Sequence, residues 1–187
     1  MSRSVPSRRH QLRHRLQDRH AEVESAVGGF DSMPDYRRYL RGMHAFRAPV
    51  EAMIATQPWP EAFGGWRPCL IAGLVAADGS DLGVAAADIV PPPAASFDMA
   101  GLLGQLYVLE GSMLGAQILY RRAQELGMHS TYGARHLARQ AADVANWQAF
   151  VRLLDRIEPF DLGRTADAAD TTFRAAAVAF RAAATAA

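Results

Sequence analysis

The sequence predicts a single domain built entirely of helices. Apolar residues recur every three or four positions through most of the 187 residues, which is the period of an amphipathic helix. No segment alternates apolar and polar residues over the length of a strand. The length suits one domain, and 50% hydrophobic with 21% charged residues is an ordinary globular composition. We therefore expect residues 1–187 to form one domain, with residues 1–6 as a flexible basic tail.

Glycine, proline and capping residues mark the ends of the expected helices. The first helix ends at Gly28, which can adopt the left-handed conformation that closes a helix. The second begins at Pro34, because proline is tolerated in a first turn, and should break or kink at Pro49. A long helix follows Asp98, a good N-cap, and ends at Gly127. The expected helices cover residues 7–27, 34–56, 69–77, 99–126, 141–157 and 165–184, and residues 84–97 form the longest irregular connection.

Charge and cysteine content exclude several classes of protein. The net charge is +1, which argues against a dedicated nucleic-acid binder, and all 20 basic residues are arginine. An anionic ligand would therefore meet guanidinium groups rather than lysine side chains. Cys69 is the single cysteine, so no disulfide can form within the chain and a cytoplasmic location is expected. No run of 18 or more apolar residues is present, so we expect no membrane-spanning helix.

His20 stands on the apolar face of the first expected helix. That face comprises Leu16, His20, Val23 and Val27. Arg13 lies two turns before the histidine and Glu24 one turn after it. A neutral imidazole held by a carboxylate, with a cation nearby, could ligate iron in an anionic cofactor. A single histidine on an apolar face is also compatible with a hydrogen-bonded core residue, so this helix alone leaves both interpretations open.

Glycines form a stripe on the long helix that follows Asp98. Gly104, Gly111 and Gly115 recur at i, i+7 and i+11, which places them on one face. Each glycine inside a helix costs about 0.5–1 kcal/mol relative to alanine, so the stripe requires a compensating role. It would let a flat ligand, or a second helix, approach the backbone closely. The spacing does not distinguish these two roles.

Two segments resemble the heme oxygenase family. Leu12–Glu24, with a basic residue seven positions before a histidine and a carboxylate four positions after it, resembles the proximal helix of heme oxygenases. Tyr107–Gln117 (YVLEGSMLGAQ) resembles the distal helix, and it is most similar to that of bacterial heme oxygenases associated with phytochrome photoreceptors. The separation of the segments agrees with the family. The resemblance implies a single-domain multi-helical bundle with heme between the first, proximal helix and the glycine-containing distal helix.

The resemblance assigns the proximal side of the site. His20 would be the axial iron ligand, with its Nδ1–H directed to Glu24 directly or through water. Arg13 would meet a heme propionate, because a guanidinium binds carboxylates well. Arg152 is a looser match to a second propionate contact, and a solvated surface arginine is an equal alternative. Leu16 stands where many members have a threonine.

The resemblance also assigns the distal side. Gly111 and Gly115 would let the distal helix lie over the heme face. Ser112 occupies the position where mammalian-type members carry an aspartate that organises distal water, and its hydroxyl would hold such a water without negative charge. Ala116 replaces the second glycine of a glycine pair and adds one methyl group near the heme. These departures bear on which carbon of the macrocycle is attacked more than on activity.

The activity implied by the resemblance is that of a heme oxygenase. Heme b, as both substrate and cofactor, would be cleaved with O2 and external electrons to biliverdin, ferrous iron and CO. The implied partners are a reductase or ferredoxin-type electron donor and a bacterial phytochrome that receives biliverdin. Two alternatives remain: a non-catalytic heme-binding or carrier protein of this fold, and a di-iron oxygenase. The second would need Glu-x-x-His pairs, and the sequence contains none.

Other polar and aromatic residues receive structural roles. We expect Glu110 to form a structural or interhelical ion pair, because it turns away from Gly111 and Gly115 on a helical wheel. The remaining histidines are expected at the surface or around the site rather than as ligands: His10, His14, His44, His129 and His136. Trp147, Phe150 and Phe173 are expected in the core.

Overall fold

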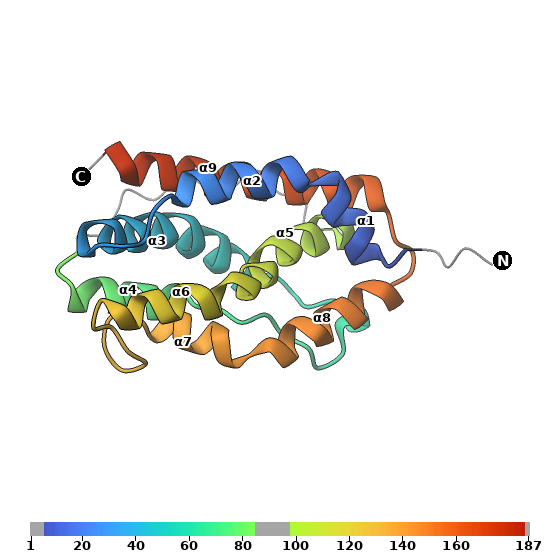
Figure 1. Cartoon of the computed structure of the whole chain (residues 1–187). Coiled ribbons are helices and arrows are strands. Elements are labelled where there is room, and N and C mark those ends of the chain that lie inside the picture. The colour runs from blue at the N-terminus through green and yellow to red at the C-terminus, as the bar shows by residue number, and fades with distance from the viewer. Residues whose placement is uncertain (1–5, 85–97, 186–187) are drawn as a thin grey trace.

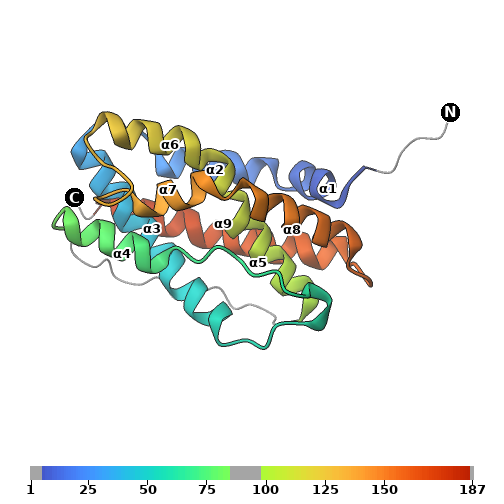
Figure 2. The same cartoon turned by 90° about the horizontal axis from the view of Figure 1, so that it is seen from below.

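The protein is a bundle of helices. The computed structural model describes residues 6–84 and 98–185, and this part of the chain contains no β-strand beyond isolated bridges around His129. The expected all-α fold is therefore confirmed (Figures 1 and 2). Most of the expected connection over residues 84–97, and residues 1–5 of the expected tail, lie outside the described residues. The helices are α1 (Arg8–Arg15), α2 (Gln17–Val27), α3 (Met33–Ala55), the 3-10 turn Glu61–Phe63, α4 (Ala72–Asp81), α5 (Met99–Gly111), α6 (Met113–Glu125), α7 (Arg135–Ala142), α8 (Val144–Arg156) and α9 (Leu162–Thr185).

The C-terminal helix α9 organises the bundle. It packs along α2, α3 and α5, and Figure 1 shows it beside α2 on one side of the molecule, with α7 and α8 on the opposite side. Small alanine side chains on α9 let these helices approach closely, and Phe173 and Phe180 fill the larger gaps as buried residues. The expected core position of the aromatic residues is confirmed for Trp147, Phe150 and Phe173.

Two glycines mark the closest helix contacts of α9. A Cβ atom on Gly104 would stand 2.4 Å from the Thr165 carbonyl oxygen, so α5 meets the backbone of α9 there. A Cβ atom on Gly42 would stand 2.4 Å from the Phe180 ring on the same helix. Gly104 therefore serves helix packing, which is one of the two roles that the glycine stripe left open.

Two expected helices are interrupted in the structure. The first divides into α1 and α2 at Leu16, whose φ and ψ of −110° and 12° depart from helical values. The long helix divides into α5 and α6 at Ser112. In contrast, Pro49 does not end α3, because Leu40 and Ile54, on either side of it, are both buried in the same core. Tertiary packing outweighs the local cost of the proline.

The start of α4 is set by a buried carboxylate on α3. The carboxylate of Glu51 accepts hydrogen bonds from the amides of Ile71 and Ala72, at 2.9 and 2.8 Å, and so supplies the partners that a helix N-terminus lacks. For this reason α4 begins at Ala72 rather than near Cys69. Glu51 also pairs with Arg47, with Nε and Oε1 2.7 Å apart, and both side chains are almost fully buried. Removing one member of such a pair leaves the other charge uncompensated.

The expected helix over residues 141–157 is wrong at its N-terminal end. The chain forms two helices, α7 and α8, which meet at Asp143. α7 begins at Arg135 because Asp78 on α4 accepts hydrogen bonds from the amides of Arg135 and His136, both at 3.0 Å. This cap comes from a residue more than fifty positions away in the sequence. The residues around Arg135 therefore do not indicate that a helix begins there.

The two environments of glycine predict opposite effects of alanine. We expect Gly104→Ala to destabilise the protein by about 1–3 kcal/mol, because the new methyl group collides with the backbone of α9. Gly73→Ala on α4 is the matched control, since no neighbouring atom outside the helix backbone lies within 4 Å of the added Cβ. It should be neutral or stabilising by up to about 1 kcal/mol. Urea denaturation of both variants measures the difference. Equal effects of the two substitutions would contradict the close approach of α5 and α9.

Candidate functional site

A cavity of about 430 Å³ opens between the proximal and distal segments of the bundle. One side is formed by α1 and α2 and another by the junction of α5 and α6, and α3, α7, α8 and α9 contribute further lining residues. Apolar side chains such as Met43, Phe46 and Phe173 make up much of the lining, with few polar groups among them. This combination is typical of a site for a large apolar ligand that carries a few polar substituents.

His20 lines the cavity from α2 with one ring nitrogen already used. Its Nδ1 lies 2.9 Å from the Leu16 carbonyl oxygen, which can only accept, so Nδ1 carries the hydrogen. The remaining nitrogen, Nε2, then bears the lone pair that a metal requires. The Phe173 ring lies 4.6 Å from the imidazole and restrains its position. The expected partner, Glu24, does not make this hydrogen bond, because Nδ1 is bonded instead to the backbone carbonyl four residues earlier.

Arginines stand at the edge of the cavity on α1. Arg13 and Glu24 both line the cavity and are exposed to solvent, as expected for groups at a mouth. Arg9, one turn before Arg13, also lines it, with its guanidinium carbon 5.6 Å from the centre of the Trp147 ring. Burial raises the pKa of Tyr107, and the charges of Arg9 and Arg13 act in the opposite direction. The i, i+4 spacing of Arg9 and Arg13 places both on one helix face, and it is the sequence signal that indicates a second cation at this edge.

The opposite wall is largely backbone. Gly111, Ser112, Gly115 and Ala116 all line the cavity. A Cβ atom on Gly115 would meet nothing within 4 Å, and one on Gly111 would meet only the Trp147 ring, at 3.9 Å. The glycine stripe therefore divides at Ser112: Gly104 faces a helix, whereas Gly111 and Gly115 face open space. This wall can accept a flat ligand against its backbone.

The helix interruption at Ser112 is held by three polar side chains. Ser112 Oγ donates to the Leu109 carbonyl oxygen at 2.7 Å and accepts from Gln140 Nε2 at 2.9 Å. Arg47 Nη1 also donates to the Leu109 oxygen, at 3.1 Å. Arg47 and Gln140 line the cavity although both are buried, and neither was singled out from the sequence.

Comparison with known proteins identifies the family. The chain is 31% identical over 150 residues to the heme oxygenase PigA of Pseudomonas aeruginosa, and the match spans 74% of this chain and 73% of that protein. This chain belongs to the heme oxygenase family. Its fold is similar to that of the NO- and CO-bound heme oxygenase from Neisseria meningitidis, with a TM-score of 0.80, 25% sequence identity, and coverage of 96% of this chain and 92% of that one. No model of a protein family matches the chain.

Membership of the heme oxygenase family decides against a di-iron oxygenase. Within residues 6–84 and 98–185, no three His, Cys, Asp or Glu side chains gather in a way that could hold a metal ion. No helix in this part of the chain is both long enough and apolar enough to span a membrane.

Two residues of this heme oxygenase have surroundings that differ from those expected from the sequence. Arg152 is exposed on α8 and is not part of the cavity lining, so the expected second propionate contact is not supported. Glu110 is fully buried, and none of the described residues forms an ion pair with it. Its carboxylate accepts from the Cys69 amide at 2.8 Å and from Asn146 Nδ2 at 2.9 Å. Burial raises the pKa of Glu110, and these hydrogen bonds oppose the rise.

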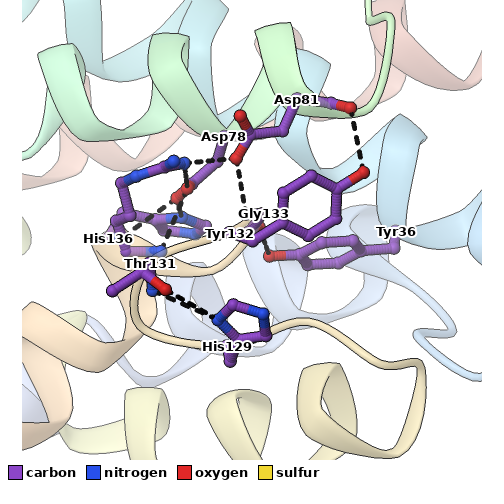
Figure 3. A network of polar contacts seen from close by, with 9 residues as sticks. Tyr36, Asp78, Asp81, His129, Thr131, Tyr132, Gly133 and His136 are labelled. Atoms are coloured by element: carbon purple, nitrogen blue, oxygen red, sulfur yellow. Dashed lines mark hydrogen bonds and ion pairs between the residues drawn. The ribbon is translucent and has the colours of Figure 1, made fainter.

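A buried histidine network adjoins the cavity through Tyr39. His136 was expected at the surface or around the site. It is fully buried, with Nδ1 2.7 Å from Asp78 Oδ2 and Nε2 3.3 Å from the Tyr39 hydroxyl. Tyr39 lines the cavity. Figure 3 shows Asp78 and Asp81 beside the start of α7 and the loop before it. Asp81 Oδ2 accepts a hydrogen bond from the Gly133 amide in this loop, at 2.8 Å.

The protonation states in this network follow from burial. Burial lowers the pKa of His136 below its ordinary value of 6.5, although Asp78 acts to raise it. For Asp78 burial opposes ionisation, but the hydrogen bonds from His136 and Arg135 outweigh burial and lower its pKa. A neutral imidazole therefore donates from Nδ1 to a carboxylate and offers Nε2 as an acceptor to the Tyr39 hydroxyl.

The lowered pKa of His136 predicts acid sensitivity of the ligand-free fold. As the pH falls below 6.5, the unfolded chain binds a proton at this histidine that the folded chain does not, so the free energy of unfolding decreases. The contribution is at most about 1.4 kcal/mol per pH unit. Denaturation curves between pH 7.5 and 5 should show a shallower decrease in His136→Gln than in the wild type. The exposed His129→Gln variant should retain the wild-type slope, and an unchanged slope in His136→Gln would be contrary to a neutral His136.

Proposed function

We propose that this heme oxygenase cleaves heme b to biliverdin, ferrous iron and CO, with His20 as the proximal iron ligand. The single observation that carries the proposal is the opposition of two features across one cavity. His20 has its Nδ1 hydrogen bonded to the Leu16 carbonyl, and the facing wall at Gly115 has open space in place of a side chain. When bound, heme supplies the iron that activates O2 and the macrocycle that is oxidised.

The protein contributes orientation on the proximal side. A backbone carbonyl that accepts from Nδ1 fixes the tautomer of the imidazole, so that Nε2 is the nitrogen with the lone pair for a ligand. Phe173 limits rotation of the ring through contact at 4.6 Å between ring centres. Glu24 then serves as an acidic group at the cavity edge rather than as the partner of Nδ1.

Arg13 is proposed to bind a heme propionate. Its guanidinium is at the solvent-exposed mouth, where the carboxylates of a bound heme would remain hydrated. A guanidinium and a carboxylate form paired, charge-assisted hydrogen bonds, which fix rotation of the substrate about the axis through the iron. That rotation would determine which edge carbon of the macrocycle occupies a given position in the cavity.

The distal wall is proposed to act through its shape. The backbone at Gly111 and Gly115 lets the helix junction lie close to the substrate, and Ala116 adds a single buried methyl group beside it. A close wall restricts where a small ligand on the substrate can tilt. Ser112 is proposed to hold a water molecule on this side. The contribution of these residues is positioning rather than covalent chemistry.

The proposed partners follow from the reaction. Cleavage of heme by O2 consumes electrons, so we propose a reductase or ferredoxin-type donor. The likeness of Tyr107–Gln117 to the distal segment of phytochrome-associated enzymes supports a bacterial phytochrome as the recipient of biliverdin.

Incubation with hemin and ascorbate under air tests the activity. Loss of the heme absorption with appearance of biliverdin, identified by chromatography, supports the proposal. Conversion to a stable ferrous complex without biliverdin would instead indicate a non-catalytic heme carrier of the same fold.

His20→Ala tests the iron ligand. This variant should lose the histidine-coordinated heme spectrum and the cleavage activity, and added imidazole should partly restore both, because it can occupy the vacated space. The exposed His10→Ala variant on α1 should behave as the wild type. The assignment of His20 is wrong if its alanine variant binds and cleaves heme unchanged.

Arg13→Ala tests the propionate contact. We expect weaker heme binding by roughly 1.5–3 kcal/mol, or a changed ratio of biliverdin isomers, with the histidine-coordinated spectrum retained. Heme titration and isomer chromatography measure these effects. Arg152→Ala removes an arginine outside the cavity and is the matched control, which should leave affinity and isomer ratio unchanged. Identical results for the two variants would eliminate the role of Arg13.

A further inference from the structure

The hydrogen of the Ser112 hydroxyl is already committed within the protein. Ser112 Oγ lies 2.7 Å from the Leu109 carbonyl oxygen, and because a carbonyl can only accept, Ser112 must donate to it. A hydroxyl carries one hydrogen. Ser112 therefore has no hydrogen left for the cavity while this bond is present.

Gln140 occupies one of the two lone pairs of the same hydroxyl. Its side-chain nitrogen lies 2.9 Å from Ser112 Oγ, and the residue is only 2% exposed. The opposite orientation of the amide would bring its oxygen to Ser112, where it would need the hydrogen that Leu109 already takes. Because Ser112 has only one hydrogen to donate, the Gln140 side chain must point its Nε2 toward Ser112. One lone pair of Ser112 remains, and Ser112 lines the cavity.

We propose that Gln140 is a positioning residue that holds Ser112 as a hydrogen-bond acceptor toward the cavity. The proposal rests on the proposed function, since it concerns the distal side of the heme site. A water molecule resting on Ser112 must donate one hydrogen to it, which leaves its second hydrogen for the substrate side. Ser112 thus orients a proton-donating water and is not itself the proton donor.

The position of Gln140 on α7 explains how this orientation is maintained. α7 is fixed at its start by Asp78, and the Leu109 oxygen is fixed by Arg47 Nη1 at 3.1 Å. The hydroxyl is therefore held between two anchored groups. If the amide donor is removed, the hydroxyl can rotate away from Leu109 and present its hydrogen to the cavity.

The ligand-free protein provides a first test of the contact. In 15N-labelled protein, the side-chain amide hydrogens of Gln140 should exchange slowly with solvent and their NMR signals should shift in Ser112→Ala. The signals of Gln124, which is exposed on α6 outside the cavity, should not shift. Rapid exchange of the Gln140 amide, or signals that are unaffected by Ser112→Ala, would overturn the proposal.

The ferric heme complex provides the test of the role. In this complex the water that donates to Ser112 would be the one at the iron, and its pH-dependent spectral transition reports deprotonation of that water. An acceptor such as Ser112 favours the protonated water. We expect both Ser112→Ala and Gln140→Leu to lower the midpoint of this transition by roughly 0.5–1 pH unit, the equivalent of one neutral hydrogen bond. The double variant should show no further decrease than Ser112→Ala alone, and Gln124→Leu should match the wild type.

The outcomes separate this proposal from the proposed function. Additive shifts, a raised midpoint or an unchanged midpoint in Gln140→Leu would overturn the positioning role, even if the wild type cleaves heme. A wild type that binds no heme would overturn the proposed function, while the NMR measurement would still decide whether Gln140 holds Ser112. Ser112→Ala keeps both measurements available if Gln140→Leu does not fold.

Discussion

The structure of the site depends on the interruption of one helix at Ser112 and on the buried guanidinium that holds it. Arg47 donates to the Leu109 carbonyl next to the interruption and pairs with Glu51 one turn along α3. Glu51 in turn supplies the N-terminal partners of α4, α4 supplies those of α7, and α7 returns to Ser112 through Gln140. The polar contacts form a closed circuit through the apolar bundle. Because burying a guanidinium is costly unless it is fully paired, each member of the circuit limits the movement of the others.

The sequence predicted the fold class because helical periodicity is encoded locally. The same periodicity places a histidine and glycines on particular helix faces, and the resemblance of two segments to heme oxygenases assigned those faces to the two walls of one site. Periodicity does not reveal an interruption such as that at Leu16, where residues on both sides continue the same pattern. It also could not separate Gly104 from Gly115, because the difference between them lies in what packs opposite.

Residues whose hydrogen-bond partners lie far away in the sequence were not predicted, for a related reason. The start of α7 and the burial of His136 depend on a carboxylate of α4, and the role of Gln140 depends on a hydroxyl of another helix. Polar residues of this kind look like surface residues when only their neighbours in the chain are considered. Glu110 is the same case: its partners are a loop amide and an asparagine of α8. Their roles follow only from the hydrogen bonds that they form in the folded structure.

The partner of the His20 imidazole has an evolutionary consequence. Because Nδ1 donates to a main-chain carbonyl, no single side-chain replacement can delete the acceptor, as it could if a carboxylate held the ring. The electronic character of the imidazole is therefore insulated from most mutations of its surroundings. The hydrogen bond to Nδ1 changes only when the backbone at Leu16 changes its conformation, for example through an insertion or through a proline or glycine at this position. Divergence among related sequences is then expected at positions where a side chain itself makes the contact, such as Ser112 and Gln140 on the opposite side of the cavity.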